Sequence, residues 1–292
     1  MKKRILTLLL TGMLGAGNSA IAQDVVFPKS SPSAVVKQGF ATSFVELNYS
    51  RPSAKGRAIF GDLVPFGEIW RTGANSATTI EFGQNVKIDG KEIGKGKYGL
   101  LSIPNKENWT IILTKDLNVT SANAYKKEND ILRIETKTNA LSQNVETFTI
   151  EVSSISENKC TVEIKWEKTS VSFDVNADFE NDLMAQIEKT MSTDNRPYYA
   201  SAQYYFSNKK DMSKALEWIR MADKQSPGRY WIENLKAKIE FENKLYVEAI
   251  ETAKNARENA TKAGNAAYAK QMEDLIKSIE NNPEIKLPKK KK

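Results

Sequence analysis

The spacing of the hydrophobic residues changes near residue 176, and this change restricts the chain to folds in which strands precede helices. From about residue 35 to residue 175, apolar side chains recur at every second position, as in "VELNY" and "FTIEV", which is the period of half-buried strands. Beyond residue 176 they recur every three or four positions, as on helices that bury one side. The sequence therefore predicts an α+β fold, in which an antiparallel β-sandwich is followed by a helical bundle, with a closed barrel as the alternative for the first half.

Two hairpins are predicted within the strand-rich half. Asp89 and Gly90 separate "VKI" from "KEI", and this dipeptide favours a type I′ turn, which needs positive φ at both central positions. A second hairpin joins "GKYGLLSIP" to "WTIILT" through the polar residues 105–108. Both hairpins favour antiparallel pairing of neighbouring strands.

The helical half contains an internal repeat of small residues. The triplet Ala215, Ile219 and Ala222 is followed at a displacement of 34 residues by Ala249, Ala253 and Ala256. This displacement is the tetratricopeptide length, and small residues at such positions let paired helices approach closely. A tetratricopeptide-like stack is therefore predicted, with an ordinary four- or five-helix bundle as the alternative.

Helical repeats present surfaces that take protein or peptide partners, so we expect the helical half to bind one. The candidate contact residues are Tyr204, Tyr205, Trp218 and Trp231. Aromatic residues at helical spacing also serve as core, and this alternative stays open.

The first 22 residues have the pattern of a secretory signal. "MKKR" precedes a short apolar run over residues 5–10, and Ala20-Ile21-Ala22 gives the small-residue cleavage pattern, so we expect cleavage near Ala22. A membrane anchor is the competing interpretation, but the apolar run is about half of the roughly 20 residues that span a bilayer. The predicted organisation is a signal peptide over residues 1–22, a β-sandwich domain over 23–175 and a helical domain over 176–292. The mature chain is expected in the periplasm or outside the cell, without a transmembrane segment.

The formal net charge of +7 lies at the two ends of the chain. Three of the excess charges are Lys2, Lys3 and Arg4, and four are the lysines of residues 289–292. The body between them is neutral, whereas nucleic-acid binders gather cations on one surface, so we expect no nucleic-acid partner. The lysine tail is expected to be a solvated end, with docking on anionic lipid as the alternative.

Several kinds of catalytic chemistry are absent from the sequence. The chain has no histidine and one cysteine, which excludes histidine-based triads, histidine-ligated zinc and an internal disulfide. Cys160 alternates in phase with Val162 and Ile164, so we expect a buried, inert thiol. Hydrolysis by two carboxylates, with Asp62 and Glu68 as candidates, remains the open enzymatic option. We expect a non-enzymatic protein without a cofactor or a metal.

Residues 49–79 form an irregular connection between two predicted strands. In a structural role its arginines would pair with carbonyl groups that the sheets leave unpaired. In a binding role its cations and aromatic rings would converge on an anion, an acidic glycan or a peptide terminus. The candidate ligand-binding residues are Tyr49, Arg51, Lys55, Arg57, Trp70, Arg71 and Asn75.

Three segments carry a resemblance to a known family. "YSRPSAKGRAIFG", "LVPFGEIWRTGANSATT" and "GKYGLLSIPNKENWTIIL" resemble the exported bacterial family called domain of unknown function 2911, which is found largely in Bacteroidetes. The resemblance covers about residues 32–175. It implies a periplasmic β-rich domain, and it implies no activity, cofactor or catalytic residue.

Overall fold

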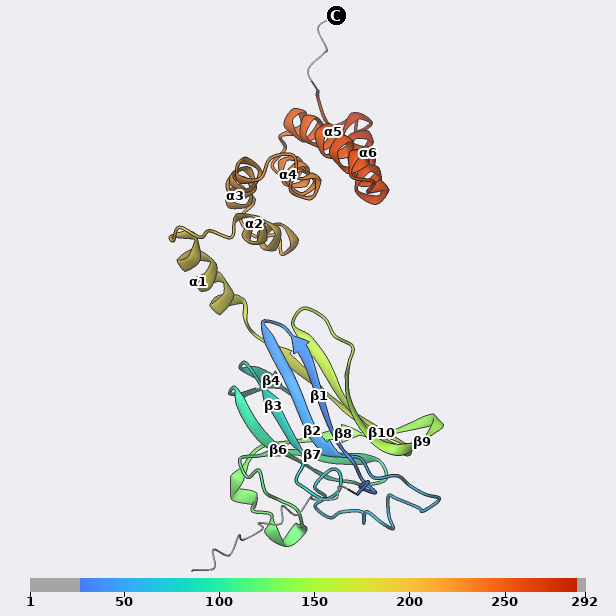
Figure 1. The fold of residues 1–292 in the computed structure, drawn as a ribbon. Helices are drawn as coiled ribbons and strands as arrows, with labels where there is room; N and C mark the ends of the chain where they lie inside the picture. Colours follow the sequence, from blue (N-terminus) through green and yellow to red (C-terminus); the bar gives the residue numbers. More distant parts are fainter. Residues whose placement is uncertain (1–26, 288–292) are drawn as a thin grey trace, which may run out of the picture. The chain divides into compact units, whose positions relative to one another are not determined.

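The computed structural model describes residues 27–287, and the chain divides into two compact units between Asp178 and Phe179. We call residues 27–178 the β unit and residues 179–287 the helical unit. The predicted α+β fold is confirmed, because two antiparallel sheets precede six helices in the described part of the chain (Figure 1).

The β unit contains one six-stranded and one four-stranded sheet. The larger sheet has the order β1 (Ser33–Phe40), β2 (Ser43–Ser50), β3 (Thr79–Phe82), β6 (Gly96–Ile103), β7 (Asn108–Thr114) and β8 (Asp130–Lys137). The smaller sheet has the order β5 (Lys91–Ile93), β4 (Val86–Ile88), β10 (Lys159–Ala177) and β9 (Asn139–Ser153). Strands β9 and β10 form a long hairpin whose register shifts on either side of Glu167.

A cluster of aromatic side chains joins the two sheets. Trp109 on β7 and Trp166 on β10 both contact Phe60, with ring centroids 4.8 and 6.2 Å away. Phe148 on β9 lies 5.5 Å from Trp166. Trp109, Phe148 and Trp166 are each at most 2% exposed, so the sandwich core is built on large rings that bury much apolar surface.

Both predicted hairpins are present. Strands β4 and β5 pair around Asp89 and Gly90, whose φ angles of 50° and 74° are both positive, as a type I′ turn requires. Strands β6 and β7 pair through the second turn. Cys160 is buried on β10, and burial raises the pKa of its thiol to about 11, which keeps it protonated and unreactive at neutral pH.

The loop between β7 and β8 covers the side of β6 and β7 that faces away from the smaller sheet. Val119 from the loop packs on Leu101 of β6 and Ile112 of β7, and all three are buried. The Tyr125 hydroxyl donates a hydrogen bond to Asp130 at 2.6 Å and so closes the loop. Burial is the main cause that raises the pKa of Tyr125 to about 12, and the hydrogen bond to Asp130 adds to it. Strands β6 and β7 are therefore covered on this side as well as in the sandwich core.

The helical unit consists of six helices, and the last five pack against one another in chain order. They are α1 (Glu180–Met191), α2 (Tyr198–Ser207), α3 (Met212–Gln225), α4 (Tyr230–Glu242), α5 (Tyr246–Lys262) and α6 (Ala266–Glu280). The repeated small residues on α3 and α5 are all at most 4% exposed. Their side chains therefore belong to the hydrophobic core of the helical unit.

No helix among residues 27–287 has both the length and the apolar character needed to span a membrane. The predicted signal peptide and the lysine tail lie outside the described residues.

Helix α4 contains a buried carboxylate. Glu240 is 2% exposed, and its Oε2 atom has no hydrogen-bond partner in the described structure. Burial raises the pKa of the Glu240 carboxyl, although Thr252, Lys236 and Arg220 act in the opposite direction. Because the folded state holds this proton more tightly than the unfolded chain, the free energy of unfolding falls as pH rises from the ordinary glutamate pKa through the raised one.

Replacing Glu240 with glutamine is expected to stabilise the helical unit at pH 7, because glutamine has no charge to bury. The pH dependence of unfolding above pH 4 should also flatten. Urea denaturation followed by circular dichroism at 222 nm measures both effects. The exposed Glu251→Gln variant is the control, and an equal response of the two variants would contradict the prediction.

Candidate functional site

The end of β2 and the connection that follows it cover the free edge of β9. Strand β9 lies at the edge of its sheet, so its outward backbone groups need partners from elsewhere. The hydroxyl of Tyr49 accepts from the Ile150 N–H and donates to the Ile150 carbonyl, both at 2.9 Å. Tyr49 is 3% exposed, so this pairing takes place in the core.

Arg51 and Pro52 continue this edge contact. The Phe148 N–H donates to the Pro52 carbonyl at 2.8 Å, and Arg51 Nε donates to the Phe148 carbonyl at 3.0 Å. Arg51 Nη2 also donates to Thr149 at 2.7 Å. Arg51 therefore performs the structural role considered for the loop arginines, in which it pairs with a carbonyl group of the sheet edge.

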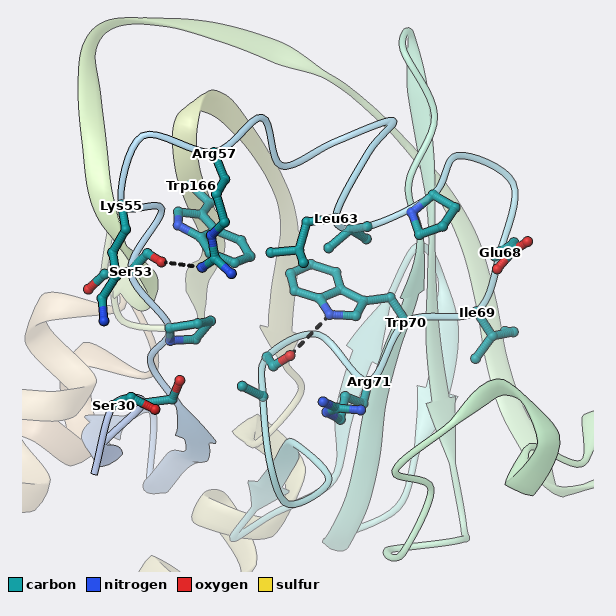
Figure 2. A pocket seen from close by; sticks show the side chains of 16 residues that line it. Ser30, Ser53, Lys55, Arg57, Leu63, Glu68, Ile69, Trp70, Arg71 and Trp166 are labelled. Carbon is teal, nitrogen blue, oxygen red and sulfur yellow. Dashed lines mark hydrogen bonds between the residues drawn. The ribbon is translucent and has the colours of Figure 1, made fainter. Parts of the chain in front are cut away.

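The remaining connection encloses a pocket of about 420 Å³ in the β unit. It contains four of the seven candidate ligand-binding residues, namely Lys55, Arg57, Trp70 and Arg71 (Figure 2). The other lining residues are Ser30, Ser31, Pro52, Ser53, Leu63, Val64, Pro65, Glu68, Ile69, Gly73, Ala74 and Trp166. Tyr49, Arg51 and Asn75 do not line it, and Asn75 instead donates to the Ser31 carbonyl at 3.1 Å.

The cations of the pocket form no ion pair, although Glu146 accepts from the Lys55 backbone N–H at 2.8 Å and Glu167 accepts from the Ile59 N–H at 3.2 Å. No carboxylate of the described residues lies within 4.0 Å of the charged nitrogens of Lys55, Arg57 or Arg71. Glu68 also lines the pocket, but Figure 2 shows it on the opposite side of the Trp70 ring from Lys55 and Arg57. The side of the pocket that holds Lys55 and Arg57 therefore presents two cations that have no ion-pair partner among the described residues.

Hydrogen bonds to backbone carbonyls hold the two pocket arginines. Arg57 donates to the Ser53 carbonyl at 2.7 Å and to the Ala54 carbonyl at 2.9 Å. Arg71 donates to the carbonyl of Thr120 in the β7–β8 loop, and its buried Nε atom has no partner among the described residues. Neutral carbonyls orient these guanidinium groups and leave their full charge available to an anion.

The partly exposed Trp70 ring forms the aromatic wall of the pocket, and the buried Trp166 ring supports it. Trp70 and Trp166 stack with their planes 16° apart and their centroids 6.1 Å apart. Trp70 Nε1 donates to the Gly73 carbonyl at 3.0 Å. Gly73 has a φ of 153°, and a Cβ atom there would lie 2.9 Å from Thr78 Oγ1, so a side chain is excluded. Trp166 was not among the sequence candidates because its strand phase indicated only that it points inward.

The lining contains one carboxylate, Glu68, whereas glycoside hydrolysis uses two. Asp62 does not line the pocket. No group of three or more acidic or cysteine side chains able to hold a metal occurs within residues 27–287. The arrangement is therefore suited to binding an anion against an aromatic surface rather than to two-carboxylate hydrolysis.

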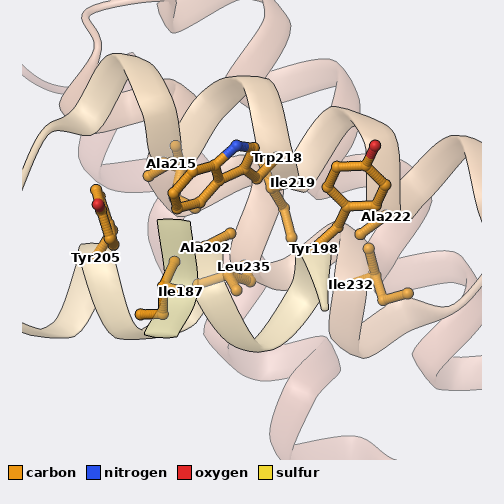
Figure 3. Packing of buried hydrophobic residues seen from close by; sticks show 11 residues of the cluster. Ile187, Tyr198, Ala202, Tyr205, Ala215, Trp218, Ile219, Ala222, Ile232 and Leu235 are labelled. Atoms are coloured by element: carbon orange, nitrogen blue, oxygen red, sulfur yellow. The ribbon is translucent and has the colours of Figure 1, made fainter. Parts of the chain in front are cut away.

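The four aromatic candidates of the helical unit lie in different environments. Tyr205 and Trp218 are 1% and 8% exposed, and their rings meet at 4.7 Å inside the core shown in Figure 3. Tyr204 is half-buried against the same cluster. Trp231 is 36% exposed, and Arg229 lies over its ring at 5.5 Å. Tyr205 and Trp218 therefore serve as core, and Trp231 is the most accessible of the four.

The Tyr49→Phe variant is expected to unfold more easily by about 2 kcal/mol, because both backbone groups of Ile150 lose their buried partner. Urea denaturation measures this change. Tyr98→Phe is the matched control, since that hydroxyl bonds the Gly94 carbonyl at an exposed position and its loss should cost less than about 0.5 kcal/mol. Equal stability of the wild type and Tyr49→Phe would show that the edge contact contributes nothing.

Arg51→Met is expected to lower the free energy of unfolding more than Arg57→Met does. Loss of Arg51 leaves the Phe148 carbonyl unpaired and should lower the unfolding free energy by about 1–2 kcal/mol. Loss of the exposed Arg57 should change it by less than about 0.5 kcal/mol. Calorimetry of both variants checks the ranking, and a larger loss for Arg57→Met would reverse the roles assigned to these residues.

Comparison with known proteins finds a family match for the β unit. No curated protein and no solved structure matches the chain. Residues 31–175 match the model of a family described as "Protein of unknown function (DUF2911)", in agreement with the resemblance seen in the sequence. The matched residues begin before β1 and end within β10, so they include nearly all of both sheets and every residue that lines the pocket except Ser30. We therefore assign residues 31–175 of this chain to the DUF2911 family.

Proposed function

We propose that this chain is an exported, non-enzymatic binding protein whose β unit takes an anionic ligand, specifically an acidic glycan, in the pocket beside Trp70. The proposal depends on one observation. Lys55, Arg57 and Arg71 line a pocket with an aromatic wall, and no described carboxylate lies within 4.0 Å of their charged groups.

The chemistry of the pocket suits a sugar acid. A planar guanidinium group binds a carboxylate through paired hydrogen bonds, and a tryptophan face packs against the apolar face of a sugar ring. The volume of about 420 Å³ lies within the range of small-molecule sites. Loops that carry such residues on a rigid sheet are common places for ligand binding.

An exported location supports this choice of ligand. Residues 1–22 carry the signal-peptide pattern, and a periplasmic or secreted protein meets polysaccharides of the cell envelope and its surroundings. The chain would fold there without an internal disulfide, because it has one cysteine.

We propose in addition that the helical unit is a tetratricopeptide-like stack that docks a protein or peptide. The buried small residues of α3 and α5 recur at the 34-residue displacement of such repeats, and this supports the proposal. The exposed Trp231 gives the unit an accessible aromatic side chain. The protein would thus hold a glycan through one unit and a partner through the other.

The proposed glycan site is tested with oligogalacturonate, an acidic oligosaccharide, by intrinsic tryptophan fluorescence and calorimetry. The Lys55→Met/Arg57→Met double variant is expected to bind at least about tenfold more weakly, because it loses two charged donors. Affinity should also fall as salt concentration rises. The Lys91→Met/Lys95→Met variant removes the same charge at exposed positions outside the pocket and should bind like the wild type.

A glycan array extends the test to other acidic and neutral sugars. Equal binding of neutral and acidic glycans, or equal loss of affinity in both double variants, would contradict the assignment to this pocket. Release of shortened oligosaccharides by the purified protein would contradict the non-enzymatic part of the proposal.

A further inference from the structure

A second group of aromatic side chains lies on the helical unit, where α4 and α6 meet. The rings of Tyr230 and Tyr268, near the starts of these helices, are 5.1 Å apart. Trp231 adds an exposed ring 5.1 Å from Tyr230. The Tyr230 hydroxyl accepts a hydrogen bond from Asn265 at 3.3 Å. Partly exposed, oriented tyrosine and tryptophan rings of this kind are enriched where proteins bind partners.

Polar side chains continue the same face along α4. Asn234 and Lys238 follow Tyr230 at intervals of four residues, so the three lie on one side of the helix. Gln271 of α6 lies between the last two, because its Oε1 atom is 3.1 Å from Lys238 Nζ and 3.5 Å from Asn234 Nδ2. Asn234 is 4% exposed and lies beneath this surface, so we call Tyr230, Lys238, Tyr268 and Gln271 the α4–α6 face.

Lys238 is a half-buried cation without an acidic partner. No carboxylate of the described residues lies within 4.0 Å of its Nζ atom, and burial lowers the pKa of Lys238. Neighbouring lysines differ, because Lys236 pairs with Asp223 at 2.6 Å and Lys270 pairs with Asp274 at 3.2 Å. A partly desolvated ammonium group gains more from an incoming carboxylate than an exposed one does.

We propose that the α4–α6 face docks an extended peptide segment that carries a carboxylate. The carboxylate binds Lys238, the amide of the exposed Gln271 bonds the peptide main chain, and an apolar side chain of the peptide packs on Tyr230 and Tyr268. This inference rests on the proposed docking role of the helical unit and gives that unit a site and a partner chemistry. It is independent of the pocket in the β unit.

The side chains on this face favour a peptide over the other anionic polymers. A side-chain amide presents a donor and an acceptor side by side, which matches the alternating N–H and C=O groups of an extended backbone. A single unpaired lysine is too little charge for nucleic acid, whose binding depends on many phosphate contacts. The carboxylate can belong to the peptide C-terminus or to an acidic side chain, and the experiment separates these two sources.

The test uses the full chain and a library of short random peptides displayed with free C-termini. Peptides selected by the protein are synthesised as free acids, as C-terminal amides and with each Asp or Glu replaced by Asn or Gln. Their affinities are measured by fluorescence polarisation. We expect one of the two neutralising changes to weaken binding at least about tenfold, and the sensitive change identifies the source of the carboxylate.

Variants then locate the site. Lys238→Met should weaken binding at least about tenfold while the melting temperature stays the same or rises, because a desolvated charge is removed. Lys270→Met, which removes an exposed lysine from α6, should leave the affinity within about twofold. The Lys55→Met/Arg57→Met pocket variant should bind the peptides like the wild type.

Three results would overturn the inference. They are the selection of no peptide, the selection of peptides whose affinity survives both neutralising changes, and the selection of peptides that bind Lys238→Met as tightly as the wild type. In the last case, loss of binding in Trp231→Ala would show that the helical unit docks the peptide at Trp231 rather than at Lys238. Retention of oligogalacturonate binding by Lys238→Met keeps either outcome separate from the glycan proposal.

Discussion

The edge of β9 that has no neighbouring strand is the constraint on which the architecture of the β unit depends. Backbone groups at a sheet edge need partners, and here they obtain them from the end of β2 and the segment that follows it rather than from a further strand of the same sheet. Tyr49 and Arg51 carry the side-chain part of this pairing, and Pro52 carries the main-chain part. These hydrogen bonds fix the backbone of Arg51 and Pro52 on β9, so they also fix where the rest of the connection starts.

The pocket follows from that anchored start. Because Pro52 is held on β9, the next residues pass over the aromatic core, and Trp70 returns to stack on Trp166. Lys55 and Arg57 then line the pocket, and neither side chain forms an ion pair with a described carboxylate. Within one connection, the chain therefore uses one arginine to complete the sheet and places other cations around an open space.

Helix α4 shows the same contrast between satisfied and unsatisfied charge. Lys236 is paired with Asp223. Lys238 is half-buried and Glu240 is buried, and neither has an ion-pair partner among the described residues. Positions two residues apart point to nearly opposite sides of a helix, so these two charges do not neutralise each other. Lys238 faces Gln271 of α6, while Glu240 is buried near Thr252 of α5. Burial without pairing costs stability, which makes α4 the part of the helical unit where a functional role for charge has the strongest physical argument.

The sequence by itself determined the order of strands and helices, the turn at Asp89 and Gly90, and the absence of histidine chemistry, because periodicity, turn preference and composition are local properties. It also indicated that the residues around Trp70 were functional candidates. Only the tertiary structure decided which of them meet. Tyr49 and Arg51 turn toward β9 because their partners lie about 100 positions further along the chain, at Ile150 and Phe148, and no local spacing encodes such a contact. The same long-range packing brought Trp166 into the pocket and placed Tyr205 and Trp218 in the core, since a side chain's exposure depends on which distant segment covers it.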